Sequence, residues 1–406
     1  MEILVLNSGS SSLKFQLIET SPEQIQADAD RIRARGSIEK IGTDEAIISV
    51  DTGDAKTKYT REVLEHRDAV GIAASCLQDA GGITKEQIEG VGHRIVHGGE
   101  RFTQSVLIDE EVLQHVREAI ELAPLHNPHN LKGYVAAREM LPQARHAAVF
   151  DTSFHQTLPR HAFMYGLPHV VYDRHRVRRY GFHGTSHRYV SYRYAQMLGK
   201  TRQEYKLITC HLGNGCSACA IDHGRSVDTS MGFTPLEGLL MGTRAGDVDP
   251  AAVLHVMSKE ELTIHEVSSL LNKHSGLYGL SGISNDMRTL IEQAGKGNER
   301  ARLAIDVFCY RVKKYIGAYL AILNGADAVL FTGGIGENAP AIRAQICDRL
   351  DALGIVLDPA RNEAARGQAS RISRDNSACQ VWVIPTDEEL LIARDTLRCI
   401  LGLPHP

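Results

Sequence analysis

The 406-residue sequence lacks a long apolar run, a marked excess of either charge and a low-complexity linker between its parts. No stretch approaches the ~18 consecutive apolar residues of a membrane span, so we expect no transmembrane helix. The opening residues MEILVLNSG carry neither a basic segment nor a cleavage site, and we expect no signal peptide. The 45 basic and 49 acidic side chains give a formal net charge of −4, which demands no polyanion as a partner.

Cysteine is also sparse, with eight residues scattered along the chain. Cys216 and Cys219 alternate with Ala218 and Ala220 in an apolar run, and no second cysteine pair stands at zinc-site spacing. This pattern is typical of buried, reduced thiols, and it predicts a cytoplasmic protein.

Three segments repeat one pattern, an apolar run followed by a turn of small residues. The runs at residues 3–6, 207–210 and 328–332 lead into NSGSSS, HLGNG and GGIGEN, and alternating strands follow the first two turns. Strands that end in small-residue turns form the skeleton of α/β proteins that handle nucleotides. A chain of this length predicts two domains, and we place their boundary near residue 150.

Helical patterns lie between these segments. Apolar residues at 308, 312, 316, 320 and 323 line one face of a helix that we expect to end at Asn324 and Gly325. A last helix is predicted from Thr386, which forms a capping-box pattern with Glu389. This interpretation leaves Glu388 without a structural role.

Two familiar phosphate-binding patterns fit poorly. Residues 199–201 (GKT) look like the end of a Walker A loop, but Tyr194 stands where that loop needs glycine. Residues 213–218 and 334–339 both match a loose dinucleotide fingerprint. A strand pattern follows the first, and the second comes in the last fifth of the chain, whereas a dinucleotide unit usually opens its sheet. We therefore do not interpret the chain as a Rossmann protein.

Four charged residues stand in small-residue or glycine-rich surroundings. Lys14 follows the serine-rich turn, Arg94 precedes a glycine pair, Asp151 follows an apolar strand, and Arg244 lies between glycines. Guanidinium, ammonium and carboxylate groups together suit phosphoryl transfer, where catalysis is mostly positioning and charge neutralisation. An ordinary hairpin turn, a structural ion pair and a helix cap stay open as alternatives for Lys14, Arg94 and Asp151.

Residues 173–195 interleave six arginines with aromatic residues, a composition that also occurs in nucleic-acid binders. The glycine-bounded turn at residues 181–184 interrupts this patch, so we favour a solvated arginine surface beside a site histidine. His183 and His187 are four residues apart, but the glycine and small residues between them disfavour a helix and argue against a zinc site.

Seven segments in order resemble the signatures of the acetate kinase family. They are residues 7–14 (NSGSSSLK), 92–99 (GHRIVHGG), 151–155 (DTSFH), 181–187 (GFHGTSH), 211–215 (HLGNG), 242–244 (GTR) and 331–338 (FTGGIGEN). The matches extend over nearly the whole chain. One departure is Asp387, where the family usually has asparagine, and its extra charge would lie beside a proposed metal ligand.

The resemblance implies an α/β fold of two duplicated ribonuclease H-like (actin-like ATPase) domains with an interdomain cleft. Residues 1–150, completed by the helix at 386–403, would form one domain. Residues 151–385 would form the second, which would carry most of the ATP site. It also implies a homodimer with neither a nucleic acid nor a membrane as partner.

Site residues follow from the resemblance position by position. Asn7 and Glu388 would bind Mg²⁺, for which Mn²⁺ could substitute, and Asp151, His183, Arg244 and Arg94 would serve catalysis, with His126 as a lesser helper. Substrate binding would fall to Arg94, Val96, Leu125, Phe182 and Pro235. ATP would be held by Lys14, His211, Leu212, Gly213, Asn214, Gly215, Asp286, Met287, Arg288, Gly334, Ile335, Gly336, Glu337 and Asn338.

The implied reaction is reversible in-line transfer of the γ-phosphoryl group of MgATP to acetate, which gives acetyl phosphate and ADP. A carboxylate is ionised at neutral pH and needs no base, so we interpret Asp151 as an orienting residue with proton transfer secondary. Propionate and butyrate kinases share these motifs, and one methylene is worth only ~1–3 kcal/mol in an apolar pocket. A partner-regulated actin-like or chaperone-like ATPase is the alternative from another class.

Overall fold

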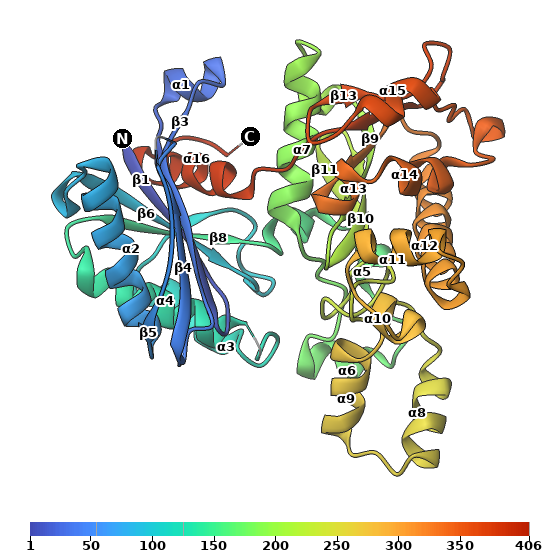
Figure 1. Ribbon diagram of the computed structural model, residues 1–406, viewed down its shortest axis with the longest axis horizontal. Helices are drawn as coiled ribbons and strands as arrows, with labels where there is room; N and C mark the ends of the chain where they lie inside the picture. Colours follow the sequence, from blue (N-terminus) through green and yellow to red (C-terminus); the bar gives the residue numbers. More distant parts are fainter. Residues whose placement is uncertain (54, 125, 406) are drawn as a thin grey trace. The chain divides into compact units, whose positions relative to one another are not determined.

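The computed structural model describes residues 1–53, 55–124 and 126–405. The chain divides into two compact units: Met1–Gln156 together with Asp387–Pro406, and Thr157–Thr386. We refer to them as unit 1 and unit 2 (Figure 1).

Unit 1 is built on an eight-stranded sheet in the order β5-β4-β3-β2-β1-β6-β8-β7. Its strands are β1 (Glu2–Ser8), β2 (Ser12–Glu19), β3 (Arg31–Glu39), β4 (Thr43–Asp51), β5 (Lys56–Val63), β6 (Ile88–Ile95), β7 (Val106–Leu107) and β8 (Arg145–Phe150). Its helices are α1 (Pro22–Ala27), α2 (His66–Gly81), α3 (Glu110–Glu118), α4 (Asn127–Met140) and α16 (Glu388–Leu401), with 3₁₀ turns at Lys85–Gln87 and Ser153–Thr157. The predicted hairpin is confirmed, because β1 and β2 pair antiparallel and Gly9 N–H donates to Ser12 O at 2.8 Å.

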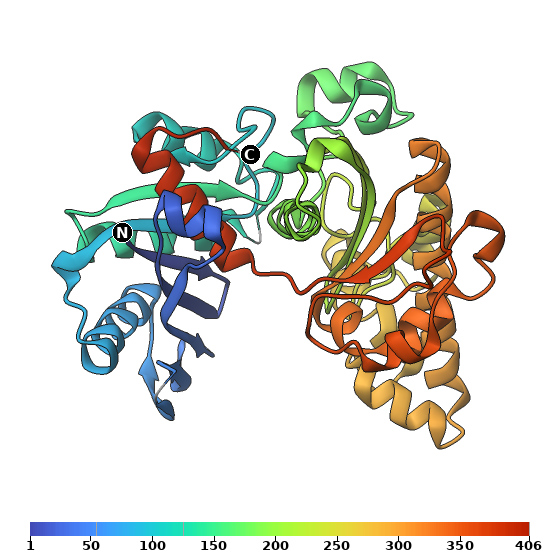
Figure 2. The ribbon, with the colours of Figure 1, turned by 90° about the horizontal axis from the view of Figure 1, so that it is seen from above.

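Alternation along β1 explains why both faces of this sheet are covered. Leu4 and Leu6 join a core that includes residues of α2 and α4, whereas Ile3 and Val5 pack with residues of α16 on the other face. Figure 2 shows α16, in red, lying beside β1. The last helix of the chain therefore completes a core that the first residues begin.

Two glycines of β6 let α16 approach the sheet closely. A Cβ at Gly90 would lie 2.6 Å from Ile400 Cδ1, and one at Gly92 would lie 2.4 Å from Thr396 Oγ1. The buried Arg394 of α16 also pairs with Asp28 at 2.7 Å and Asp30 at 2.5 Å. Small residues on the strand and an ion pair on the helix thus hold α16, and Glu388 at its start, in one position.

Unit 2 has a six-stranded sheet in the order β11-β10-β9-β12-β14-β13. Its strands are β9 (Lys206–Leu212), β10 (Cys216–Asp222), β11 (Arg225–Thr229), β12 (Ala328–Thr332), β13 (Ser370–Arg371) and β14 (Gln380–Val383). Its first helices are α5 (Arg160–Phe163), α6 (His169–His175), α7 (Gly184–Met197), α8 (Pro250–Lys259), α9 (Ile264–Lys273) and α10 (Gly276–Ser281). The later ones are α11 (Met287–Gly295), α12 (Glu299–Leu323), α13 (Gly333–Asn338), α14 (Pro340–Cys347) and α15 (Pro359–Ala364), with 3₁₀ turns at Arg202–Glu204 and Asp351–Leu353.

Two predictions of local structure in unit 2 are confirmed. The strand pair at HLGNG is β9 and β10, and α12 ends at Asn324, whose φ of 51° is left-handed.

The eight cysteines are free thiols, and burial raises the pKa of Cys216 to about 12. None of the helices that the structure describes is both long and apolar enough to cross a membrane.

Three sequence interpretations are wrong. The GGIGEN segment is helix α13 rather than a turn, since Gly333 at φ 74° lets the chain start a helix directly after β12. His183 is the N-cap of helix α7, which carries His187 one turn later. Arg178 and Arg188 are buried rather than solvated, with the Arg178 guanidinium 3.7 Å from the centre of the Phe163 ring.

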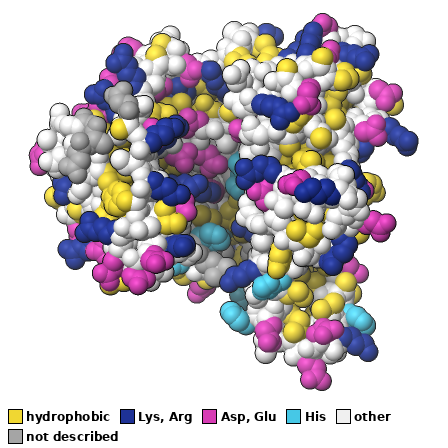
Figure 3. Space-filling model, viewed as in Figure 1, with side chains coloured by type: hydrophobic (Ala, Val, Ile, Leu, Met, Phe, Trp, Pro, Cys, Tyr) yellow, Lys and Arg dark blue, Asp and Glu magenta, His cyan; other side chains and the backbone are white. Residues whose placement is uncertain are grey.

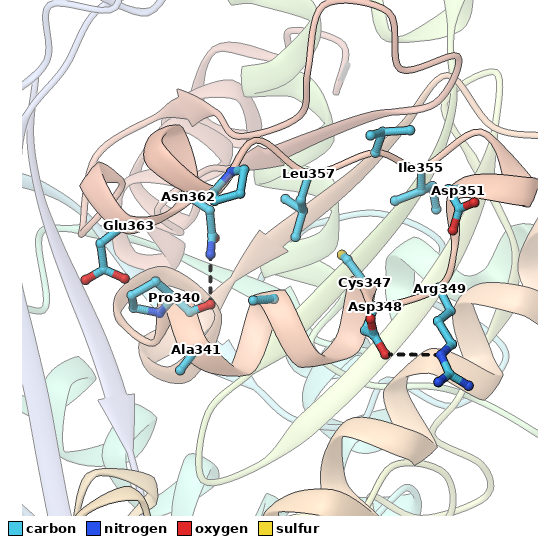
Figure 4. Close-up of a pocket in the computed structure, with 13 residues that line it drawn as sticks. Pro340, Ala341, Cys347, Asp348, Arg349, Asp351, Ile355, Leu357, Asn362 and Glu363 are labelled. Atoms are coloured by element: carbon cyan, nitrogen blue, oxygen red, sulfur yellow. Dashed lines mark hydrogen bonds and ion pairs between the residues drawn. The ribbon is translucent and has the colours of Figure 1, made fainter.

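The side of the molecule that Figure 3 displays has no large patch of only positive or only negative side chains. Basic and acidic side chains are interspersed there on each unit. This distribution agrees with the near balance of charge in the sequence.

Two buried histidines, His93 of β6 and His146 of β8, form a pair in unit 1. His93 Nε2 lies 2.9 Å from His146 Nδ1, and His146 Nε2 lies 3.3 Å from the Leu141 carbonyl oxygen. Burial lowers the pKa of His146 to about 4. Burial, and then the neighbouring His146, lowers the pKa of His93 well below its usual value. Both rings are therefore neutral in the folded protein at neutral pH.

We expect the stability of the protein to fall as the pH drops from 6.5 toward 4. The unfolded chain then binds protons at these histidines while the folded chain does not, and His146 alone accounts for on the order of 3 kcal/mol. Urea unfolding of the wild type and of His146→Asn between pH 7.5 and 4.5 measures the effect. The variant should show a shallower dependence on pH, and parallel curves would contradict the assignment.

Candidate functional site

Polar side chains gather at one edge of the unit 1 sheet. Asn7 lies near the end of β1 and faces Lys14 across the hairpin, Arg94 lies near the end of β6, and Asp151 follows β8. Because β1, β6 and β8 are parallel neighbours, their carboxyl ends share this edge. Glu388, the first residue of α16, approaches the same edge, since its Oε2 lies 3.9 Å from Arg94 Nε.

Arg94 and Asp151 form a two-pronged ion pair. Arg94 Nε donates to Asp151 Oδ1 at 2.9 Å, and Arg94 Nη2 donates to Asp151 Oδ2 at 2.6 Å. Burial lowers the pKa of Arg94, but Asp151 and Glu388 raise it by more, so the guanidinium stays charged. The structural ion pair that the sequence left open is present, and its remaining edge is Nη1, which lies 3.4 Å from Asn7 Oδ1.

The oxygen atoms at this edge suit a hard cation. Asn7 supplies an amide oxygen and Glu388 a carboxylate, which are ligands that Mg²⁺ prefers together with water and phosphate. Across the described part of the chain, no group of three or more His, Cys, Asp and Glu side chains has the arrangement of a metal site. Asn7 and Glu388 could contribute two oxygen ligands to a cation that takes its other ligands from water and a nucleotide, the usual situation for Mg²⁺.

The start of α16 corrects the predicted capping box. The N-cap is Asp387, whose carboxylate accepts from Leu390 N–H at 2.9 Å, rather than Thr386. Burial raises the pKa of Asp387. Asparagine caps helices as well as aspartate does, so the departure at this position keeps the same structural role.

Asn130 is a positioning residue that the sequence reading missed. Its Oδ1 accepts from Val96 N–H at 3.0 Å, and its Nδ2 donates to Ser8 O at 2.8 Å. It thus fixes the end of β1 beside Asn7 to the loop that follows β6 and Arg94. A sequence signal for this role exists, because two asparagines stand three residues apart at the start of α4. The other one, Asn127, also accepts from and donates to backbone groups, those of His97.

A second polar cluster lies in unit 2. The ring centres of His183 and His211 are 4.3 Å apart. A Cβ at Gly215 would lie 3.4 Å from His183 Nε2 and 3.7 Å from Arg244 Nη1. The absence of a side chain at Gly215 therefore leaves room where the histidine edge and the guanidinium converge. His183 has a left-handed φ of 55°, a conformation that is costly outside glycine and common at functional sites.

Arg244 differs from Arg94 in its surroundings. Its Nη1 donates to the Pro235 carbonyl oxygen at 3.2 Å, and it makes no ion pair with any residue that the structure describes. Burial lowers the pKa of Arg244. A half-buried guanidinium without a carboxylate is costly unless it binds an anion.

The glycine-rich segments of unit 2 are braced by specific contacts. Asn214 Oδ1 accepts from Asn285 Nδ2 at 3.0 Å. Glu337 accepts from Gly333 N–H at 2.9 Å and from Thr386 N–H at 3.1 Å, so it fixes the start of α13. Arg343, which the sequence reading also missed, donates to the Gly336 carbonyl oxygen at 2.9 Å from within the core.

The other residues predicted to bind ATP have mixed surroundings. Lys14, Gly334 and Asn338 are exposed, Ile335 is half-buried, and Leu212 and Gly336 are buried. Asp286 caps α11 and pairs with Arg288, whose side chain is 91% exposed, whereas Met287 is buried. The segment that begins α11 therefore offers a charged surface rather than the side chain of Met287.

The predicted substrate-binding residues are distributed over both units. Arg94 and a half-buried Val96 belong to unit 1, and a buried Phe182 and a half-buried Pro235 belong to unit 2. Leu125 lies outside the residues that the structure describes. His126, the predicted lesser helper, is the N-cap of α4.

Two α/β units of this kind, with a cationic site and glycine-rich turns, define a kinase with the duplicated actin-like ATPase fold. Residues 2–394 match the sequence profile of the Acetokinase family. The chain belongs to this family.

The similar proteins agree with this assignment over their full length. The acetate kinase of Solibacter usitatus is 54% identical over 100% of both chains, and that of Chloroherpeton thalassium is 52% identical over 99% of both. Among solved structures, the Porphyromonas gingivalis acetate kinase has a TM-score of 0.93 at 45% identity, covering 98% of this chain and 99% of its own. A Francisella tularensis propionate kinase has a TM-score of 0.91 at 40% identity, covering 99% of this chain and 100% of its own.

We expect Asp151→Ala to lower the free energy of unfolding by ~3–5 kcal/mol, because it leaves a largely buried guanidinium without its main partner. Urea denaturation measures this loss. Asp51→Ala is the matched control in the same unit, since Asp51 pairs with Arg35, whose side chain is 55% exposed. The control should lose much less stability. Equal losses of unfolding free energy in the two variants would show that the buried Arg94–Asp151 pair contributes no more to stability than the exposed pair.

Proposed function

We propose that the protein transfers the γ-phosphoryl group of MgATP to acetate, reversibly and by direct in-line displacement, giving acetyl phosphate and ADP. Membership of the Acetokinase family supports this reaction, as do the acetate kinases to which the chain is about 50% identical over its full length. The reaction needs little covalent chemistry from the protein, because phosphoryl transfer depends on positioning and charge neutralisation.

The observation that carries the proposal is the state of Arg244. A half-buried arginine without an ion-pair partner among the described residues, close to His183 and Gly215, offers donors for the oxygens of a phosphoryl group. Negative charge spreads over these equatorial oxygens during transfer. A guanidinium that no carboxylate neutralises interacts with that charge in full.

Arg94 would bind the acetate carboxylate. Its Nε and Nη2 atoms are engaged by Asp151, so Nη1 is the edge that would face the substrate. Asp151 would then orient the guanidinium instead of accepting a proton, because acetate is already ionised at neutral pH. Val96, Leu125, Phe182 and Pro235 would surround the methyl group.

Asn7 and Glu388 would hold Mg²⁺ directly or through water, with Mn²⁺ as a possible substitute. The ion would supply neutralisation of charge on the β- and γ-phosphate oxygens. Lys14 would add a positive charge near the phosphates. The segments His211–Gly215, Asp286–Arg288 and Gly334–Asn338 would bind the rest of ATP, the last of them around the adenosine.

A homodimer and a cytoplasmic location complete the proposal. Apolar side chains of α8 and α9 support self-association, since Leu254 is 66% exposed and Ile264 is 80% exposed. Eight free thiols support a reducing compartment.

Propionate kinase activity is the second candidate, and the similarity to the Francisella propionate kinase favours it. A side chain at position 96 larger than alanine is the feature that favours acetate. The difference of one methylene group is worth only ~1–3 kcal/mol in an apolar pocket.

The first experiment is ATP-dependent hydroxamate formation with Mg²⁺ and hydroxylamine, using acetate, propionate and butyrate in turn. We expect rapid trapping with acetate and kcat/KM values that fall with each added methylene. Chelation of the divalent cation should abolish the signal. A maximum at propionate would keep the mechanism and replace the substrate. No hydroxamate with any acid, alongside slow ATP hydrolysis, would instead indicate a partner-regulated ATPase.

Arg94→Ala and Arg244→Ala should each lower kcat by ~10³–10⁵, the contribution of an arginine at a phosphoryl transition state. Arg302→Ala, on the exposed surface of α12, is the matched control and should keep wild-type turnover. Steady-state kinetics with acetate measures all three variants. Near-normal turnover in either site variant would remove that arginine from the mechanism.

A further inference from the structure

Behind His183, a line of hydrogen-bonded side chains runs into the core of unit 2. His183 Nδ1 lies 2.9 Å from Ser217 Oγ, and Ser217 Oγ lies 2.8 Å from His187 Nε2. His187 Nδ1 lies 2.7 Å from Thr209 Oγ1. His187, Ser217 and Thr209 are completely buried, so every hydrogen in this line needs a partner within the protein.

The buried end of the line determines where the hydrogens lie. Thr209 has one hydroxyl hydrogen, and among the described residues its hydroxyl contacts only the ring of His187. If His187 Nδ1 carried a hydrogen, the Thr209 hydrogen would be buried without an acceptor, which costs ~1–3 kcal/mol. Thr209 therefore donates to Nδ1, and the neutral His187 ring carries its hydrogen on Nε2.

The same accounting continues outward. His187 Nε2–H donates to Ser217 Oγ, which leaves the single Ser217 hydrogen for its other partner, His183 Nδ1. We propose that Thr209, His187 and Ser217 fix neutral His183 as the tautomer with its hydrogen on Nε2. They are positioning residues, and His183 is the group they act through.

In the proposed reaction, Nε2 is the ring nitrogen of His183 that would contact the phosphoryl group. A Cβ at Gly215 would be 3.4 Å from His183 Nε2 and 3.7 Å from Arg244 Nη1, so both donors lie close to the same face of Gly215. A hydrogen fixed on Nε2 makes His183 a donor to a phosphoryl oxygen there. Because the tautomer is set beforehand, the site pays no reorganisation cost when charge develops on that oxygen.

The proposal also explains the spacing of the two histidines. His183 caps α7 and His187 lies one turn later on the same helix, so both rings reach Ser217 on β10. The pattern that resembled a metal site is thus a pair of rings bridged by one hydroxyl group. This inference rests on the proposed function for its catalytic meaning, but the tautomer can be observed without any substrate.

The test is ¹⁵N NMR of the full chain labelled at histidine, recorded near pH 8 without substrate, with the His183 signals assigned by their loss in His183→Gln. We expect the hydrogen-bearing nitrogen of both His183 and His187 to be Nε2. A hydrogen on His183 Nδ1 would overturn the proposal whatever the enzyme's activity.

Variants test the line from two positions. Ser217→Ala should give His183 a mixture of tautomers, and the near-isosteric Thr209→Val should loosen the preference of His187. Thr229→Val, a buried threonine of β11 in the same sheet, is the matched control and should leave the His183 spectrum unchanged. If Ser217→Ala does not fold, the wild-type spectrum and Thr209→Val still decide. Unchanged His183 tautomers in a folded Ser217→Ala would contradict the proposal.

Kinetics separates positioning from a general loss of structure. Ser217→Ala should lower kcat for acetate about 10- to 100-fold and leave KM for ATP nearly constant, since the donor acts mainly in the transition state. Ser217→Cys, which retains a weak donor, should recover part of the loss. A fall in kcat together with a rise in the KM for ATP would indicate a structural role and overturn the assignment. Absence of kinase activity in the wild type would defeat the proposed function and leave the tautomer result standing.

Discussion

A guanidinium group that leaves water must meet negative charge, and this requirement organises both candidate clusters. In unit 1 the protein supplies the charge itself, since Asp151 accepts from two nitrogens of Arg94, Nε at 2.9 Å and Nη2 at 2.6 Å. In unit 2 no residue that the structure describes forms an ion pair with Arg244. The first arrangement fixes an orientation and leaves one edge for a small carboxylate. The second leaves a half-buried positive charge for a more strongly charged ligand, as a transferring phosphoryl group would be.

The geometry of unit 1 depends on a helix from the far end of the chain. Glu388 reaches the end of β6 because α16 packs onto the sheet where Gly90 and Gly92 have no side chains, and because Arg394 is tied to Asp28 and Asp30. A bulkier residue at either glycine would displace the helix and the carboxylate together. The glycine of the GHR motif therefore serves the site through packing, a role distinct from that of the arginine two positions later.

The sequence predicted the α/β fold, the hairpin at Asn7 and the place of Asp151 directly after a strand, because period-2 alternation and strand-end turns are local signals. It failed where tertiary contacts decide. The start of α7 looked too rich in glycine and small residues, but His183 takes a left-handed conformation and begins the helix. The arginines at 178 and 188 looked solvated, but aromatic rings and core contacts bury them. Ser217 carries no local signal, since its histidine partners are distant in the sequence.

The protein contains two pairs of hydrogen-bonded histidines that differ in where their hydrogen bonds end. His93 and His146 bond directly and end at the Leu141 carbonyl oxygen, so their hydrogens are all consumed inside the core. His183 and His187 are bridged by Ser217, and that line begins at the buried Thr209 and ends at a nitrogen beside Gly215 and Arg244. A closed pair can only couple stability to pH. In the second pair, the hydrogen bond donated by the buried Thr209 hydroxyl determines, through His187 and Ser217, which ring nitrogen of His183 carries the hydrogen. That choice decides whether Nε2 of His183 donates or accepts a hydrogen bond at the site. The bridging Ser217, and not the histidines themselves, thus distinguishes the His183–His187 pair at the proposed site from the structural pair of His93 and His146.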